Sequence, residues 1–206
     1  MTSIRAGQLK GQLTRDQRAR VMHTLWPVCG ASATGTSASA GVPDATSVWA
    51  VLDCARDPRI YGALLESRLE FRCLYSGTLP RALEMVAPHL VELLPTNRLT
   101  TRLLDDGFGH AWGVFMHVAD PSALRHHLRK FLKVQDEGGH RLLFRYYDPR
   151  VLRAYLPTCR THELRQMFGP VQRYLSENRE GTSLLGFRFD GTRLVLEGAG
   201  HADDPL

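Results

Sequence analysis

The sequence lacks the features that mark membrane and exported proteins. No run approaches the ~18 consecutive apolar residues that a membrane-spanning helix needs. The first thirty residues hold five basic residues and no apolar core, so we expect no cleaved signal peptide. The four cysteines, Cys29, Cys54, Cys73 and Cys159, form no CxxC pair. We therefore expect reduced thiols and a cytoplasmic protein.

Common metal-binding and catalytic motifs are also missing. The sequence has no HExxH, no GxSxG and no paired cysteines, and Gly30–Thr36 keeps the glycine spacing of a phosphate loop without its lysine. From the residues we expect no catalytic group, no metal ligand and no cofactor. One enzymatic alternative stays open, because Asp53 ends the first predicted strand, where an α/β enzyme can place an acid–base group. Arg56 and Arg59 nearby favour an ion-paired structural aspartate instead.

What the chain has is the composition of an ordinary globular protein with an uneven charge. Hydrophobic residues make up 43% and charged residues 23% of the 206 residues, which excludes wholesale disorder. The net charge is +5. Residues 1–30 hold five basic and one acidic residue, and residues 121–160 hold nine basic and three acidic residues. Two such basic blocks suit an acidic partner, which could be nucleic acid, lipid or protein.

The first 47 residues divide into two segments. Residues 1–29 form a basic segment with a predicted helix from Thr14 to Trp26, because Thr14 and Gln17 have the spacing of a capping box and an apolar stripe follows. Residues 30–47 are almost wholly small and polar, so they cannot bury enough apolar area to order themselves. We expect a flexible linker there.

The rest of the chain is predicted to be α/β or α+β. Strand-like and helix-like runs alternate over residues 48–147, which predicts a lobe with a mixed β-sheet covered by helices. Its strongest strand, Ala111–Val118, is apolar enough to be buried on both faces. For residues 148–206 we expect a smaller, mainly helical lobe that ends in a β-hairpin of Leu184–Phe189 and Arg193–Leu196.

An Asp-Pro pair precedes three of the predicted helices. The pairs are Asp57-Pro58, Asp120-Pro121 and Asp148-Pro149. An aspartate accepts hydrogen bonds from the free amides of a first helical turn, and proline fits the first helical position because its missing donor is not needed there. We therefore interpret the three aspartates as helix caps and not as catalytic carboxylates.

The predicted helix over Pro121–Lys133 carries a basic stripe. Arg125, Arg129 and Lys133 recur every four residues, opposite the apolar side of the helix. The stripe is either a solvated face, a docking face for an acidic protein, or part of a nucleic-acid site in which Tyr146 and Tyr147 stack on bases. The run RLLFRYY lacks the glycine of an RNA-binding motif, which disfavours nucleic acid.

Six segments, in this order along the chain, carry a resemblance to a known family. They are WAVLDCARDPRIY (Trp49–Tyr61), LPRALEMVAPHLVEL (Leu79–Leu93), FGHAWGVF (Phe108–Phe115), LRHHLRKFLKV (Leu124–Val134), LLFRYYDPRVLRAYLPT (Leu142–Thr158) and FGPVQRYLSE (Phe168–Glu177). Together they resemble the adaptor/chaperone family encoded beside the VgrG spike proteins of bacterial type VI secretion systems. The resemblance spans about residues 47–190, and residues 1–46 lie outside it.

The resemblance implies a non-enzymatic role. Such adaptors bind a specific toxic effector inside the producing cell and load it onto the cognate VgrG spike protein, without nucleic acid, a membrane or a small-molecule substrate as partner. The candidate contact residues are Arg125, Arg129 and Lys133, with Tyr61, Tyr146 and Tyr155 as candidate apolar anchors. The residues that look like fold signature are Asp53, Asp57, Pro58, Trp112, Gly113, Asp148, Pro149 and Arg150.

Overall fold

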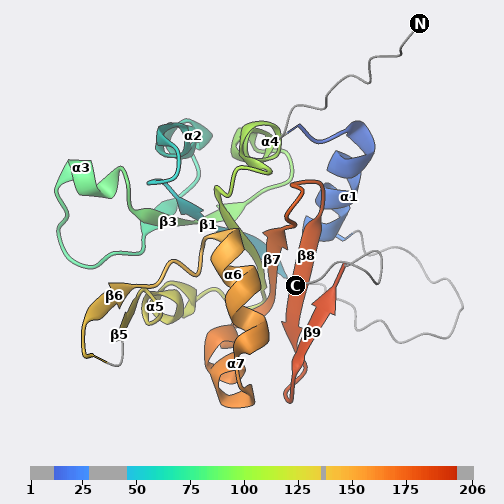
Figure 1. Cartoon of the computed structure of the whole chain (residues 1–206). Coiled ribbons are helices and arrows are strands. Elements are labelled where there is room, and N and C mark those ends of the chain that lie inside the picture. Colours follow the sequence, from blue (N-terminus) through green and yellow to red (C-terminus); the bar gives the residue numbers. More distant parts are fainter. Residues whose placement is uncertain (1–11, 28–45, 136–137, 199–206) are drawn as a thin grey trace, which may run out of the picture.

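A seven-stranded antiparallel sheet with helices on both faces organises the chain (Figure 1). The computed structural model describes residues 12–27, 46–135 and 138–198. The predicted linker, residues 30–47, lies outside the described residues except for its last two, and Cys29 lies outside them as well. No helix in the described part of the chain is long and apolar enough to cross a membrane.

The strands are ordered β2–β3–β1–β4–β7–β8–β9 across the sheet. Their bounds are β1 (Ser47–Asp53), β2 (Phe71–Cys73), β3 (Pro88–Leu93), β4 (Gly113–Val118), β7 (Val171–Glu177), β8 (Leu184–Phe189) and β9 (Leu194–Glu197). Two further strands, β5 (Lys133–Gln135) and β6 (Arg141–Leu143), pair only with each other and form a separate hairpin. Each described pairing is antiparallel.

The helices form one layer on each face of the sheet. The first layer contains α1 (Arg15–Leu25), α2 (Pro58–Ser67) and α4 (Arg98–Arg102), which continues as a π-helical turn, η1 (Leu103–Gly107). The second contains α5 (Leu124–Arg129), α6 (Pro149–Tyr155) with a following 3-10 turn, η2 (Leu156–Thr158), and α7 (Thr161–Phe168). The short helix α3 (Arg81–Glu84) stands on the connection between β2 and β3.

Apolar residues on both faces of the central strands explain the two layers. In β1, Ala50 and Leu52 face the first helical layer, while Val51 between them faces the second. All residues of β4 are buried, which confirms the prediction that this strand is covered on both faces. In α1, the capping box of Thr14 and Gln17 is present as predicted.

The basic helix α1 is part of the folded body. Val21 and Leu25 are each 1% exposed and pack in the core between the sheet and the first helical layer. Burying such a side chain contributes about 1.5–3 kcal/mol. The Nε2 atom of buried His117 lies 2.9 Å from the carbonyl oxygen of Leu25.

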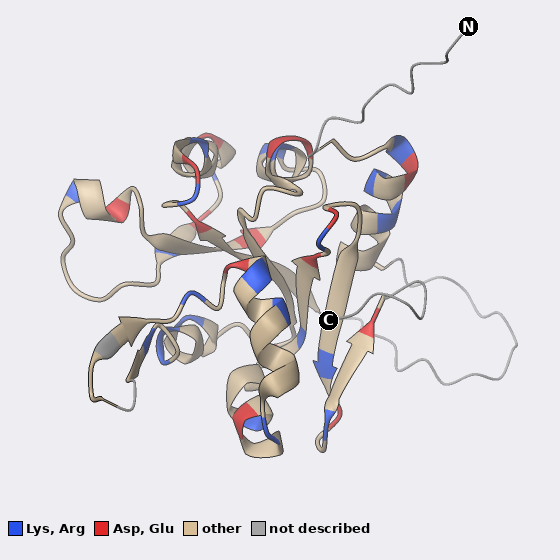
Figure 2. Cartoon of the chain, in the orientation of Figure 1, with Lys and Arg blue, Asp and Glu red and all other residues tan. Residues whose placement is uncertain are grey.

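Figure 2 shows that the basic residues of α1 and those of α5 lie at different ends of the molecule. The two basic blocks of the sequence therefore do not form one surface.

Two predictions about the sheet need correction. The sheet is antiparallel and not mixed, because a connection that contains a helix can return the chain in either direction, and the alternation of elements does not reveal which. The structure does not show the predicted helical C-terminal lobe. Instead, β7 pairs with β4 at Phe115–Leu175, so that β7, β8 and β9 complete the same sheet and end it in the predicted hairpin.

Two of the three Asp-Pro pairs begin helices as predicted. Asp57 caps α2 and Asp148 caps α6, each with proline in the first helical turn. The prediction for Asp120 is wrong, because α5 begins at Leu124 and the Asp120 carboxylate accepts a hydrogen bond from the amide of Ser122 in the preceding turn. The helix also ends at Arg129, so the predicted stripe to Lys133 does not lie on one helix.

Candidate functional site

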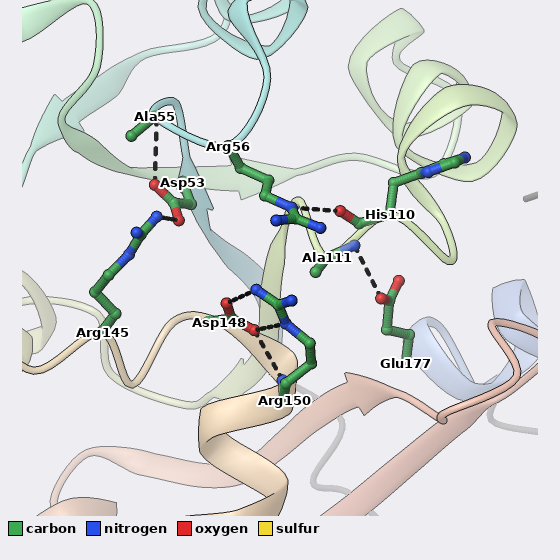
Figure 3. A network of polar contacts seen from close by, with 9 residues as sticks. All are labelled: Asp53, Ala55, Arg56, His110, Ala111, Arg145, Asp148, Arg150 and Glu177. Carbon is green, nitrogen blue, oxygen red and sulfur yellow. Dashed lines mark hydrogen bonds and ion pairs between the residues drawn. The ribbon is translucent and has the colours of Figure 1, made fainter.

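Carboxylates and arginines form a polar network where β1, β7 and the start of α6 approach one another (Figure 3). Asp53 is the last residue of β1 and is 1% exposed. One of its carboxylate oxygens accepts a hydrogen bond from the amide of Ala55 at 3.2 Å, and the other pairs with the guanidinium of Arg145. The strand end is thereby tied to the segment that leads into α6.

Asp148 belongs to the same network as the cap of α6. Its carboxylate accepts hydrogen bonds from the backbone amide of Arg150 at 2.9 Å and from the guanidinium of the same residue at 3.0 and 2.5 Å. Burial opposes ionisation of Asp148, but the hydrogen bonds and the charge of Arg150 outweigh it and hold the pKa of this carboxyl below its ordinary value. The positive charge of Arg56, in the turn after β1, also lowers the pKa of Asp148. Arg56 itself donates a hydrogen bond to the carbonyl of His110 at 3.0 Å.

Glu177, at the end of β7, fixes the loop before β4. Its carboxylate accepts hydrogen bonds from the amides of Gly109 at 2.6 Å and Ala111 at 2.9 Å. Ala111 has a φ of 58°, a left-handed conformation that costs about 1–2 kcal/mol in a residue with a Cβ. Burial raises the pKa of Glu177, and the two amides offset part of that rise. Sequence reasoning missed this residue, because nothing local marks a carboxylate that reaches a loop 66 residues away.

The network holds segments together and offers little for acid–base chemistry. Both oxygens of Asp53 are engaged, and burial together with the neighbouring Asp53 charge raises the pKa of the adjacent Cys54 thiol to about 12, so the thiol stays protonated and unreactive. Over the described ranges, no three histidine, cysteine, aspartate or glutamate side chains are grouped so that they could hold a metal ion.

The other signature residues also have structural contacts. Arg59 donates to the Asp57 carboxylate at 2.7 Å and lies over the ring of Trp112, 5.3 Å from its centroid. Gly113 pairs with Leu52 where β4 lies beside β1, and a Cβ there would lie 2.2 Å from the carbonyl oxygen of Val51. Only glycine allows this approach of the two strands.

A groove of about 590 Å³ lies between α3, α5 and the β5–β6 hairpin. We call it the α3–α5 groove. Its lining residues are Leu74, Tyr75, Ser76, Leu79, Leu83, His126, Arg129, Lys130, Leu132, Lys133 and Leu143. Leu79 and Leu83 line it from α3 and the residue run before it, and the basic side chains line it from α5 and the start of β5, together with Leu132 and Leu143. In Figure 1 its walls, α3 and the β5–β6 hairpin, project from the same side of the molecule.

The predicted basic stripe divides between two roles. The guanidinium of Arg125 donates two hydrogen bonds to the carbonyl of Cys73, at 3.1 and 2.8 Å, and so fastens α5 to β2. Arg129 donates to the hydroxyl of Ser76 and lines the α3–α5 groove. Lys133 is exposed in β5 and lines the same groove. Two of the three predicted contact residues therefore reach one surface.

The three tyrosines predicted as anchors differ in their burial. Tyr146 is fully buried and its hydroxyl donates to the carbonyl of Leu128 at 3.0 Å, so it belongs to the core and is removed from the candidate contact residues. Tyr61 is half-buried beside Phe71 and His89. Tyr155 is half-buried, with its ring centroid 4.7 Å from that of Phe144.

Comparison with known families gives one match. Residues 48–166 match the family model described as a domain of unknown function (DUF4123). The chain belongs to this family. No curated protein and no solved structure matches the chain.

The DUF4123 region runs from β1 into α7. It contains every lining residue of the α3–α5 groove and the network residues Asp53, Arg145 and Asp148. Glu177 and the strands β7–β9 lie beyond it, although β7 pairs directly with β4 in the middle of the sheet. The family region is therefore built into a sheet that the rest of the chain completes.

Proposed function

We propose that this DUF4123 protein is a non-catalytic cytoplasmic adaptor that binds a type VI secretion effector and loads it onto the cognate VgrG spike protein. The proposal rests first on the resemblance of the six ordered sequence segments to that adaptor family. One structural observation carries it further. The walls of the α3–α5 groove come from three of those segments, Leu79–Leu93, Leu124–Val134 and Leu142–Thr158.

The surface has the properties that reversible protein binding requires. An adaptor has to release its cargo, so its interface should be of moderate size, with a few apolar anchors and a polar rim. The α3–α5 groove combines exposed leucines with basic side chains in this way. In the carboxylate network, by contrast, the carboxylate oxygens already accept hydrogen bonds from arginines and backbone amides. This supports a structural role for Asp53 over a catalytic one.

The placement of the arginines also favours a protein partner over nucleic acid. A nucleic-acid site needs several cations that follow the phosphates. Of the basic residues in 121–160, Arg125, Arg145 and Arg150 are held by partners within the chain. The cations left at the groove are few and stand beside apolar side chains, which suits an acidic protein surface.

Co-purification tests the proposal. The tagged full-length chain is co-expressed with the toxin and the spike protein encoded beside it, and each is quantified after affinity purification in moderate salt. We expect both to be recovered with the chain. Recovery of neither, with both well expressed and soluble, would refute the adaptor function. Steep loss of RNA or DNA with salt during the same purification would favour the nucleic-acid alternative.

A further inference from the structure

We infer that the α3–α5 groove binds an acidic amphipathic helix of the partner protein. The inference rests on the proposed function, since we assign the helix to the effector, but it names a surface and a chemistry that the proposed function leaves open.

Two exposed leucines line this groove from different elements. Nine large hydrophobic residues are exposed in the described part of the chain, and two of them, Leu83 on α3 and Leu143 on β6, are lining residues of the groove. They are 43% and 48% exposed. Leu143 is paired with Lys133, whereas Val134 and Leu142 pair with each other on the other face of the β5–β6 hairpin. Single exposed leucines are common on protein surfaces, but two that face one groove beside cations are placed to anchor a partner.

The charge at the groove has one sign. Arg129, Lys130 and Lys133 line it beside His126, and no aspartate or glutamate among the described residues does. Among the described residues, no carboxylate forms an ion pair with Lys130 or Lys133. The two acidic residues at 136–137, between β5 and β6, lie outside the described residues. The lysines are available to a partner, and complementarity requires that partner to be acidic.

The arrangement of the walls points to a helix. The lining residues at α3, Leu79 and Leu83, are apolar, and so is the buried Leu74, whereas the cations come from α5 and the start of β5. An occupant must therefore present an apolar stripe with acidic residues along one flank, as an amphipathic helix does through positions i, i+3, i+4 and i+7. An added β-strand would turn alternate side chains away from the groove. The volume of about 590 Å³ accepts the side chains of a few helical turns and not a folded domain.

Paired variants of the full-length chain test this surface against the co-expressed toxin. Leu83→Glu with Leu143→Glu removes the apolar contacts, and Lys130→Glu with Lys133→Glu reverses the charge. The matched controls lie on the opposite end of the sheet: Leu196→Glu on β9, 43% exposed, and Arg15→Glu with Arg20→Glu on α1, both exposed. We expect each groove variant to weaken toxin binding at least tenfold and each control to change it less than twofold, with unchanged thermal unfolding in all of them.

A photo-crosslinking residue at Leu143 identifies what occupies the groove. We expect the crosslink to reach one segment of the toxin that reads as an amphipathic helix with an acidic flank. Replacing the acidic residues of that segment with lysine should restore binding to the chain that carries Lys130→Glu and Lys133→Glu. A crosslink to a second copy of this chain, to its own residues 199–206, to the spike, or to a toxin segment without that pattern would overturn the inference.

The outcomes separate this inference from the proposed function. If the toxin is recovered and the groove variants bind it as well as the wild type does, the groove inference is wrong and the adaptor function stands. If neither toxin nor spike is recovered with the wild-type chain, the adaptor function is wrong and the inference falls with it.

Discussion

Replacing Asp148 tests whether the signature Asp-Pro-Arg segment acts through helix capping. Asp148→Ala removes the acceptor for the Arg150 amide, and loss of such a cap costs about 0.5–2 kcal/mol. It also removes the ion pair with Arg150, whose side chain is 55% exposed, so that this pair adds no more than about 1 kcal/mol. We expect a total loss of about 1–3 kcal/mol. For a chain of this size each kcal/mol lowers Tm by about 2–4 °C.

Asp148→Asn separates the two contributions. Asparagine caps a helix about as well as aspartate, so this variant should lose only the charge, at a cost of about 0.5–1 kcal/mol. The pKa of Asp148 is lowered in the folded state, so the charge stabilises the fold above the unfolded pKa of about 3.9, and this stabilisation is lost as pH falls through the folded pKa. The difference in unfolding free energy between wild type and Asp148→Asn should therefore disappear in acid.

The chain supplies its own control for this experiment. Asp120 precedes a proline in the same way but caps no helix, and it lies exposed in a turn. Asp120→Ala should change the unfolding free energy by no more than about 0.5 kcal/mol. Urea unfolding of the three variants, followed by circular dichroism, measures the series. Equal losses for Asp120→Ala and Asp148→Ala, or no loss for Asp148→Ala, would refute the capping argument.

Three further predictions concern the core. Gly113→Ala should prevent stable folding, because its Cβ would lie 2.2 Å from the Val51 carbonyl oxygen. Gly62→Ala has open space around it in α2 and should stabilise the chain by up to about 1 kcal/mol. Soluble yield and urea unfolding compare the two variants. Tyr146→Phe should cost about 0.5–1.5 kcal/mol in urea unfolding and leave toxin binding unchanged, and weaker binding at full folding would return Tyr146 to the interface. Cys54 should resist thiol reagents at pH 8 until the chain unfolds, since burial raises its pKa to about 12. Mass spectrometry of the labelled native protein measures whether Cys54 has reacted.

The sequence predicts the helix starts that are set by side-chain caps. The capping box at Thr14 and the caps at Asp57 and Asp148 use residues within three positions of one another, so their spacing is visible in the sequence. Asp120 has the same local pattern, yet the chain there continues in a turn until Leu124. Tertiary packing therefore decides whether a capping sequence begins a helix at once.

The direction and extent of the sheet depend on distant pairings. β7 contains Gln172 and Arg173 between its apolar residues, so its pattern does not predict a strand, although it lies beside β4 in the middle of the sheet. The sequence predicts helical structure after Asp148, and α6 and α7 form there, but their position against the second face of that sheet follows only from where β7 pairs. This is why the C-terminal region was assigned to a separate lobe.

The groove could not be read from the sequence because one of its two exposed leucines, Leu143, stands in a run that resembles a buried strand. The run from Arg141 to Tyr147 predicts one continuous strand, but the chain pairs with β5 only as far as Leu143 and then turns inward. Leu142 and Leu143 remain exposed in the hairpin, while Tyr146 and Tyr147 enter the core. The same run therefore serves the surface and the interior, and a pattern of hydrophobicity does not separate the two.

Dependence of toxin loading on this chain is the most direct test of the adaptor function. The purified toxin and the tagged spike protein encoded beside it are mixed with and without the full-length chain, and toxin retained on the immobilised spike is measured. We predict retention that requires the chain and falls at least tenfold when Lys130 and Lys133 are replaced by glutamate. Equal retention in the absence of the chain would contradict it.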